Sequence, residues 1–485
     1  MKNYFLPFAI AGMAIVSGCA VGPDYVRPTA TLPATYLASP TELNSISKDA
    51  SEPVQHLIMN RDIPSQWWEL FHSEALNSLI QDSLKNNPSV LAAQAALRGA
   101  QENVAAQKGA YFPTVDASFT PTRQRIPDAL SSPAGNNASI YNLHTAQLNI
   151  SYAPDVFGLN RRQVESLQAQ SDTLQYQLQA SYLTLTANVA NAAIQEAALR
   201  GQLTALNAIV VSQHSLLSMI ERQHMLGNAS EVDVATQQAA LAASEANVPV
   251  IQKQLALQRD LIKALAGRFP NDNSTPQFEL SSLQLPTEIP LTLPSKLVEQ
   301  RPDVLAAEAQ LHAASAAVGI AVANRLPNIN LGVNAIGSSA YQLSDLFKSG
   351  TLFWNLAGSI TQPIFDGGTL KHRQGAAQAA YEAAEAQYRA TVLSAFQNVA
   401  DSLQALESDT VALQAAKKSQ QAAVKLLSIM QRQLALGDVS QLNVLTVEQN
   451  AQQAQLALVQ VQANRYADTV ALFQALGGGW WNKQK

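Results

Sequence analysis

Asn87-Pro88-Ser89-Val90-Leu91-Ala92-Ala93 recurs in the second half of the chain as Arg301-Pro302-Asp303-Val304-Leu305-Ala306-Ala307. The two prolines lie 214 residues apart, and the same interval carries Pro113 onto Pro327 without a gap. Short solenoid repeats recur about every 20 to 50 residues. The much longer interval therefore indicates that the chain holds two copies of one large unit.

Each copy begins with a segment that we expect to be a single helix. Residues 73–108 and 295–324 are rich in alanine, and each runs into the repeated proline. Proline removes a backbone donor, so it marks the change from helix to strand. After two predicted strands a long helix follows, at about 161–226 in the first copy and about 369–436 in the second. At 1.5 Å per residue each long helix would extend for roughly 100 Å.

Apolar residues of the first long helix follow alternating steps of four and three. They are Leu199, Leu203, Leu206, Val210, Leu217 and Ile220. Such a heptad seam predicts a left-handed coiled coil, and alanine at many other positions allows close approach of neighbouring helices. A simple coiled-coil rod is the alternative, but a rod would leave the predicted strands unexplained.

Between the helices of each copy, apolar and polar residues alternate as they do in half-buried strands. The segments are 115–120 and 147–152 in the first copy, and 329–334 and 354–361 in the second. Polar loops at about 121–144 and about 338–351 would join the strands. About ten residues with one apolar face is the pattern of a tilted outer-membrane strand. A soluble β-sandwich is the alternative.

Four such strands cannot close into a barrel, and edges open to lipid would leave unpaired backbone groups. Other chains must therefore complete the sheet. Two chains would give eight strands, whose interior side chains fill, whereas three chains are the smallest assembly with a water-filled lumen. This count favours a trimer and leaves larger rings open. The polar side chains expected to line the lumen are Asp116, Ser118, Gln147, Asn149, Asn330, Asn334 and Asn355.

The N-terminus has the pattern of an export signal. Met1-Lys2 is positively charged, residues 4–16 are apolar, and Val16-Ser17-Gly18-Cys19 follows. A short apolar region before small residues is typical of a signal peptide. The ending resembles the bacterial lipobox, which implies that Cys19 is lipidated and anchored; a plain signal peptide with a chance cysteine is the alternative. Ala20 in place of Asp resembles the outer-membrane sorting pattern, and two or more acyl chains anchor stably.

Composition excludes several classes of protein. Charged residues make up 14% of the 485, and the net charge is −5, so no nucleic-acid partner is expected. With 47% hydrophobic residues the chain is too apolar for disorder. No later stretch reaches roughly 18 continuous apolar residues, so no transmembrane helix is expected. The seven histidines are scattered and no catalytic motif is present, so we expect no enzyme, no cofactor and no metal.

Several short motifs together resemble the TolC-type outer-membrane efflux factors over essentially the whole chain. They are Trp67-Trp68-Glu69-Leu70-Phe71, Arg301-Pro302-Asp303-Val304, Pro363-Ile364-Phe365-Asp366-Gly367-Gly368 and Ala475-Leu476-Gly477-Gly478-Gly479-Trp480. Gly22-Pro23-Asp24-Tyr25 resembles the NodT-like lipoprotein branch. The resemblance implies a mainly α, internally duplicated homotrimer. Its twelve-stranded outer-membrane barrel would continue into a coiled-coil helical barrel through the periplasm.

The resemblance also assigns the segments of the chain. They are a lipoprotein signal peptide (1–18), a lipid-anchored extension with part of the equatorial region (19–72), a first repeat (73–267), an equatorial linker (268–294), a second repeat (295–477) and a C-terminal tail (478–485).

By the same resemblance the protein would be the exit duct of a tripartite efflux pump. It would passively conduct small toxic compounds and work with a periplasmic adaptor protein and an inner-membrane transporter, which would supply the energy. The transported substrate stays open. The alternatives are the same channel in a type I protein-secretion system and a structural coiled-coil lipoprotein without a pore.

Two similar turns end the long helices, Leu226-Gly227-Asn228-Ala229-Ser230 and Leu436-Gly437-Asp438-Val439-Ser440. Glycine after a helix is a typical C-cap and serine a typical N-cap. The resemblance implies that both turns are periplasmic tips where the adaptor docks. Arg222 and Arg432, one turn inside each tip, could cap the last carbonyls or meet the adaptor.

The resemblance places a periplasmic gate just inside the second tip, and its candidates are Leu442, Leu445, Thr446 and Glu448. Some relatives carry an aspartate where Thr446 stands, so a ring of aspartates is not expected. Glu448 could replace that charge or be an ordinary exposed helical residue. We expect Leu442 to narrow the resting aperture, and relaxation of the helix pair 369–476 to open it.

Overall fold

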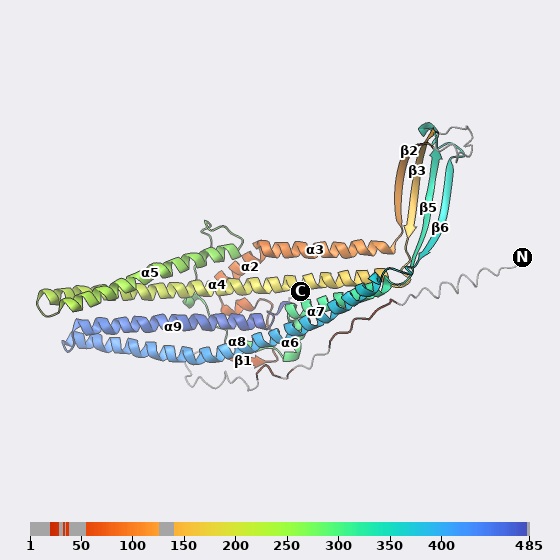
Figure 1. Ribbon diagram of the computed structural model, residues 1–485. Helices are drawn as coiled ribbons and strands as arrows, with labels where there is room; N and C mark the ends of the chain where they lie inside the picture. The colour runs from red at the N-terminus through yellow and green to blue at the C-terminus, as the bar shows by residue number, and fades with distance from the viewer. Residues whose placement is uncertain (1–19, 29–32, 34, 38–54, 126–139, 483–485) are drawn as a thin grey trace. The chain divides into compact units, whose positions relative to one another are not determined.

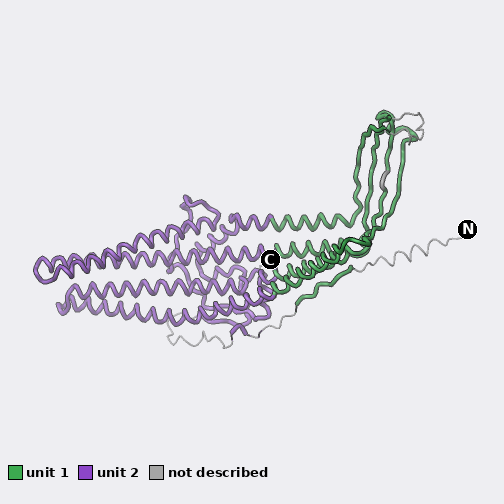
Figure 2. The backbone as a smooth tube through the Cα atoms, in the orientation of Figure 1, with its two compact units in different colours: residues 1–28, 96–174, 307–388 green, residues 29–95, 175–306, 389–485 purple. Residues whose placement is uncertain are grey.

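The computed structural model describes residues 20–28, 33, 35–37, 55–125 and 140–482. Cys19 and the signal peptide predicted at 1–18 lie outside these residues. The chain divides into two units, which Figure 2 shows in different colours. Unit 1 comprises 1–28, 96–174 and 307–388, and unit 2 comprises 29–95, 175–306 and 389–485.

Both repeats are present in the predicted order (Figure 1). The first contains α2 (Glu74–Asn86), α3 (Pro88–Lys108), β2 (Thr114–Arg125), β3 (Ile140–Tyr152), α4 (Leu159–Met225) and α5 (Glu231–Leu265). The second contains α6 (Pro294–Gln300), α7 (Pro302–Ala323), β5 (Asn328–Ala340), β6 (Leu352–Thr361), α8 (Thr369–Leu436) and α9 (Gln441–Ala475). The duplicated, mainly helical fold with four main strands is therefore confirmed.

The single first helix predicted for each repeat is wrong, because the structure has two helices there. Asn87 and Arg301 separate them and are extended, with ψ of 122° and 126°. A proline follows each of these residues, and its ring disfavours helical backbone at the preceding position. Asn87 Oδ1 also accepts a hydrogen bond from the backbone N–H of Ser89 at 2.9 Å, so it caps the next helix.

The four main strands form one antiparallel sheet in unit 1, in the order β2-β3-β5-β6. β2 continues to Arg125 and β3 begins at Ile140, so both ends of the loop predicted at 121–144 are strand instead. The pairs Thr120–Thr145 and Thr122–Leu143 continue the ladder there. Polar residues occur on both faces of this extension, so apolar and polar residues do not alternate there and the sequence pattern does not predict a strand.

The register gathers apolar residues on one face of the sheet. Two successive rows across all four strands are Val115-Ile150-Val333-Leu356 and Ala117-Leu148-Ile336-Trp354. A bulge between Val333 and Ala335 adds one residue to β5. Without it, Ile336 would lie on the polar face.

The largest buried side chains of unit 2 are aromatic. Trp67 and Phe71 belong to the 3-10 helix η2 (Trp67–Phe71) and are 1% and 0% exposed. Their ring centroids lie 5.5 and 6.5 Å from that of Phe473 on α9. Nearby, the short strands β1 (His56–Met59) and β4 (Glu288–Leu291) pair in parallel. This pair joins the N-terminal extension to the linker between the repeats.

Two of the described helices, α4 and α7, contain a window apolar enough to cross a membrane by length and composition. Within the chain, 33% and 50% of these windows are buried. Both helices are rich in alanine, which raises hydropathy and also permits close helix packing. This signal is therefore weak and fits packed helices of the two repeats.

Candidate functional site

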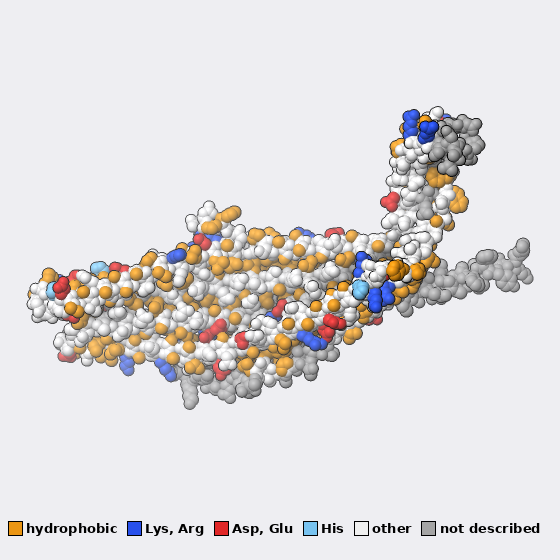
Figure 3. All heavy atoms as spheres, viewed as in Figure 1, with side chains coloured by type: hydrophobic (Ala, Val, Ile, Leu, Met, Phe, Trp, Pro, Cys, Tyr) orange, Lys and Arg blue, Asp and Glu red, His pale blue; other side chains and the backbone are white. Residues whose placement is uncertain are grey.

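The two faces of the sheet in unit 1 differ in chemistry. On the apolar face Trp354, Leu356 and Ile360 of β6 are 72%, 70% and 72% exposed, and Figure 3 shows hydrophobic side chains along the sheet. On the other face Asp116 lies opposite Asn149, and Ser118 opposite Gln147. Asn330 and Asn355 share this polar face by register, whereas the side chain of Asn334, at the bulge, lies outside the described residues.

The two predicted tips, both in unit 2, have the same backbone. Gly227 and Gly437 each have a φ of 79°. The N–H of Asn228 donates to the carbonyl of Gln223 at 2.8 Å, and that of Asp438 to Gln433 at 2.9 Å. This is the Schellman motif, which requires a left-handed residue after the helix.

The side chains of the tips differ between the repeats. Ser230 and Asp233 form a reciprocal capping box, and these hydrogen bonds hold the pKa of Asp233 below its usual range. Ser440 accepts from the N–H of Asn443 at 3.3 Å, without a return bond in the described chain. The first tip also carries Glu221 and Glu231 where the second has glutamines, so the first is more acidic.

Large side chains at both tips lie open to solvent. Leu226 is 70% exposed and Leu436 is 77% exposed. Arg222 and Arg432 are also exposed, and neither guanidinium forms a hydrogen bond or ion pair with the residues described here. The helix-capping role left open by the sequence is therefore not seen for these arginines.

The four gate candidates at the start of α9 fall into two environments. Leu445 is 5% exposed, and its carbonyl accepts a hydrogen bond from Ser212 of α4 at 3.4 Å. Leu442 and Glu448 are half-buried, and Thr446 is exposed with its hydroxyl donating to the carbonyl of Leu442 at 3.0 Å. Leu445 thus packs inside the chain, while the other three retain surface that could face an aperture.

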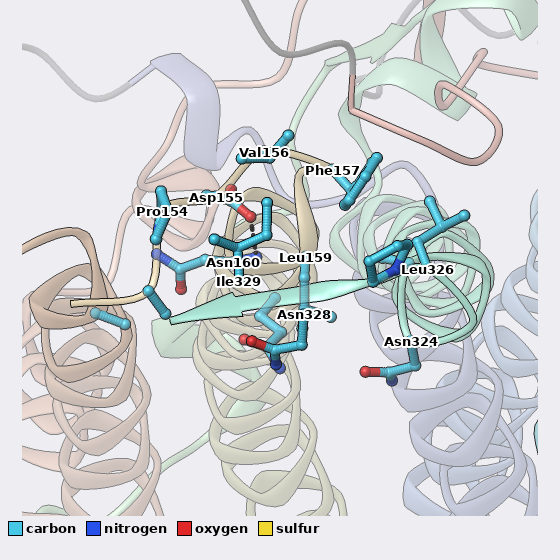
Figure 4. Close-up of a pocket in the computed structure, with 15 residues that line it drawn as sticks. Pro154, Asp155, Val156, Phe157, Leu159, Asn160, Asn324, Leu326, Asn328 and Ile329 are labelled. Carbon is cyan, nitrogen blue, oxygen red and sulfur yellow. Dashed lines mark hydrogen bonds between the residues drawn. The ribbon is translucent and has the colours of Figure 1, made fainter. Parts of the chain in front are cut away.

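A cavity of about 220 Å³ lies in unit 1, between the β3–α4 turn and the α7–β5 turn (Figure 4). The carboxylate of Asp155 accepts from the N–H groups of Asn160 and Arg161, both at 2.9 Å, and so caps α4. Asn160, Asn324 and Asn328 contribute amides to the wall. Because the carboxylate of Asp155 already caps α4, the cavity resembles a structural junction rather than a catalytic centre.

The chain matches the family described as "Outer membrane efflux protein" over residues 79–268 and 293–478. These two ranges follow the two structural repeats. The chain belongs to the outer membrane efflux protein family. Its members are channel proteins rather than enzymes, and membership confirms the resemblance drawn from the short motifs.

Relatives and solved structures cover nearly the whole efflux-family chain. It is 30% identical to the "Probable efflux pump outer membrane protein TtgC" of Pseudomonas putida, covering 100% of this chain and 97% of TtgC. It is 28% identical to the "Outer membrane protein OprJ" of Pseudomonas aeruginosa, covering 98% and 96%. Among structures, the outer-membrane channel OprN is similar with a TM-score of 0.81, 27% identity and coverage of 95% and 100%.

In unit 1 of this efflux-family protein, the segment that follows Cys19 is held in place by one buried arginine. The Arg162 side chain, 4% exposed, donates to the carbonyl of Val21 at 3.1 Å and to that of Gly22 at 3.4 Å. It also forms ion pairs of 2.8 Å with Asp24 and with Glu165. Burial opposes the charge on Arg162, but these carboxylates outweigh it and raise its pKa.

The rest of the segment packs against α7. The ring of Tyr25 stacks on that of His312 with centroids 4.3 Å apart, and His312 contacts Glu165 at 2.9 Å. Gly22 lies so close to Gly319 that an added Cβ would come within 2.5 Å of a backbone atom. The motif that suggested the lipoprotein branch therefore forms a fitted contact next to the predicted anchor.

Each repeat also holds a different cluster of charged residues in unit 2. In the first, Glu196 is fully buried and accepts from Arg200 at 2.8 Å and from Arg259 at 3.2 Å. In the second, Asp409 of α8 lies beside Asp468 of α9. Burial, together with this second carboxyl, raises the pKa of Asp409 to about 7, although Arg465 opposes the shift.

Sequence reasoning missed the arginine contacts and the charged clusters. Arg162 and Asp24 are 138 residues apart, and no local pattern links them. One available signal was the charged residues inside helices otherwise built from alanine, leucine and glutamine.

Proposed function

We propose that the protein is the outer-membrane channel of a tripartite efflux pump. It passively conducts small toxic compounds from periplasmic and inner-membrane partners to the exterior. The observation that carries this proposal is a four-stranded sheet with an exposed apolar face, a polar face and two open edges. In sequence the sheet is joined to helices of about 67 and 68 residues. Curated relatives named for toluene, antibiotic and pyoverdine export support a small-molecule cargo.

The open edges support a homotrimer. β2 and β6 each pair with one neighbour in the described chain. Backbone groups left open toward lipid are too costly to persist, so β6 of one copy pairs with β2 of the next. Three copies give twelve strands, with the apolar face toward lipid and the amide-rich face toward a water-filled lumen.

The tips and the N-terminus supply the remaining parts of the proposal. The exposed leucines Leu226 and Leu436 dock the periplasmic adaptor, and Leu442 narrows the resting duct. Cys19 carries the lipid anchor, and the contacts of Arg162 hold the segment that follows it against α4 within unit 1. The long helices extend into the periplasm.

Two substitutions on neighbouring residues of β6 test the assignment of the sheet faces. Leu356→Asp places a charge toward lipid, which is destabilising near the middle of a bilayer. We expect that the outer-membrane fraction no longer contains this variant as a heat-stable trimer. Asn355→Asp adds one carboxylate per chain to the lumen, so it should insert normally and raise cation selectivity in planar bilayers. Normal insertion of Leu356→Asp, or loss of Asn355→Asp, would refute the assignment.

Single-channel recording in the same planar bilayers distinguishes a channel from a structural lipoprotein. A structural lipoprotein without a pore gives no single-channel conductance. Cross-linking in cells, followed by identification of the attached adaptor and its transporter, then distinguishes efflux from type I protein secretion. A deletion strain exposed to a panel of toxic compounds should become sensitive to the exported class.

A further inference from the structure

Two arginines stand on the apolar face of the sheet, at its end next to the β2–β3 connection. Arg123 lies opposite Asn142, and Arg125 opposite Ile140. Both share the odd-numbered face of β2 with Val115 and Phe119, because successive side chains of a strand alternate between faces. We infer that Arg123 and Arg125 bind phosphate groups on lipids of the outer leaflet. This inference rests on the proposed membrane orientation.

The arginines lie just beyond the apolar band. On β6 the band runs from Ile360 to Leu352, which is roughly 27 Å along the strand. Leu352 pairs with Ser338, which in turn is level with Ala146 and Phe119. Arg123 is two face positions farther along β2. The length of the apolar band on β6 is close to the height expected of such a band in a membrane barrel. Arg123 therefore lies at the level at which hydrocarbon gives way to headgroups.

Neither arginine has a competing partner in the described chain. Both are exposed, and neither guanidinium forms a hydrogen bond or ion pair with the residues the structure describes. Lys348, in the β5–β6 connection, differs because its ammonium lies 2.6 Å from the carboxylate of Asp345. Figure 3 shows basic side chains gathered at this end of the sheet.

The chemistry of the pair selects a phosphorylated lipid. A guanidinium donates two parallel hydrogen bonds to one phosphate, and its aliphatic stem can lie along apolar surface while the charge reaches the headgroup. Side chains two apart on one strand face lie about 7 Å from each other. They can therefore hold two phosphate oxygens or two phosphates of one glycolipid headgroup. A lumenal anion site is excluded because both side chains lie on the lipid face.

The test uses the full-length trimer in nanodiscs of phosphatidylethanolamine, with purified lipid A as the probe and native mass spectrometry as the readout. Arg123→Gln with Arg125→Gln should weaken lipid A binding about 30-fold, because each basic residue near an anionic lipid surface contributes about 1 kcal/mol. The matched control is Lys348→Gln, at the same end of the sheet but already paired. It should leave the affinity unchanged.

Further arms separate the sources of phosphate. Lipid A stripped of its phosphates should bind the wild type as weakly as intact lipid A binds the double variant. Equal binding of both lipids would overturn the inference, and so would full displacement of lipid A by inorganic phosphate, which would indicate a free-anion site. An equal loss in Lys348→Gln would also overturn it. Single-channel conductance is recorded in parallel, because its absence in the wild type would instead contradict the proposed channel.

Discussion

Asp409 shows at the residue scale how one side chain makes a helix pair sensitive to pH. Its Oδ2 atom is buried and forms no hydrogen bond within the described chain, although the carboxyl group of Asp468 lies beside it. Two carboxylates can share a hydrogen bond only when one of them is protonated. The folded protein therefore favours protonated Asp409, which explains the raised pKa.

The sign of the pH dependence follows from that shift. Stability contributed by Asp409 is fully present below its unfolded pKa of about 4, and is lost as the pH rises through about 7. Asp409→Asn keeps a neutral group at every pH. It should raise the melting temperature at pH 8 by about 1 to 2 °C, a modest value because the site is partly exposed. Differential scanning calorimetry at pH 5 and pH 8 checks this.

A matched control lies on the same helix. Asp401 is exposed and contacts Gln397, so Asp401→Asn should shift the melting temperature equally at both pH values. If Asp409→Asn keeps the wild-type difference between pH 5 and pH 8, the carboxyl pair is not its source.

The structural role of a residue was predictable from the sequence where the local backbone determines that role. Gly227 and Gly437 are needed for left-handed backbone, and Ser230 and Ser440 cap the helices that follow. The pairing of Arg162 with Asp24 and that of Asp409 with Asp468 were not predictable, because each partner lies on a segment distant in sequence. Packing brings such residues together, and one sequence holds no local record of it.

At the scale of elements, long periodic segments were the most predictable. α8 begins at Thr369 and ends at Leu436 as expected, and α4 begins two residues earlier and ends one residue earlier than predicted. The breaks at Asn87 and Arg301 were missed although the following prolines announce them. The bulge in β5 was also missed, because it depends on pairing with β3 and β6 rather than on propensity.

The tips allow a prediction about whole turns. Leu226→Ala and Leu436→Ala remove exposed side chains, so the trimer should keep its melting temperature. If the turns dock the adaptor, each change should weaken adaptor binding by about 1 to 2 kcal/mol, and the double variant by more. Surface plasmon resonance with the purified adaptor measures this loss.

The control is Leu343→Ala, another exposed leucine, which is 60% exposed in the β5–β6 connection. It should not change adaptor affinity. The Leu436→Ala variant keeps the leucine of the first tip, so its binding depends more on that tip, which is the more acidic of the two. Added salt should therefore weaken adaptor binding more steeply for Leu436→Ala than for Leu226→Ala. Equal affinity of all variants would place docking elsewhere on the helices.

At the scale of the whole molecule, the composition of the chain agrees with the proposed duct. Only 14% of residues are charged, and the helices carry much alanine, which allows neighbouring helices to approach closely. Uncharged amides on the polar face of the sheet suit mixed solutes, since they favour neither sign of charge. The low charge, from which no nucleic-acid partner is expected, thus agrees with the proposed conduit.

Conductance of the whole assembly depends on its narrowest ring, and Leu442 is the proposed side chain there. Leu442→Ala should raise single-channel conductance in planar bilayers, because a wider ring of smaller side chains admits more ions. Leu445→Ala is the matched control three residues away. Leu445 is buried within its own chain, so its truncation should cost about 2 to 5 kcal/mol of stability without widening the ring. Unchanged conductance of Leu442→Ala, or an equal increase in Leu445→Ala, would move the constriction away from Leu442.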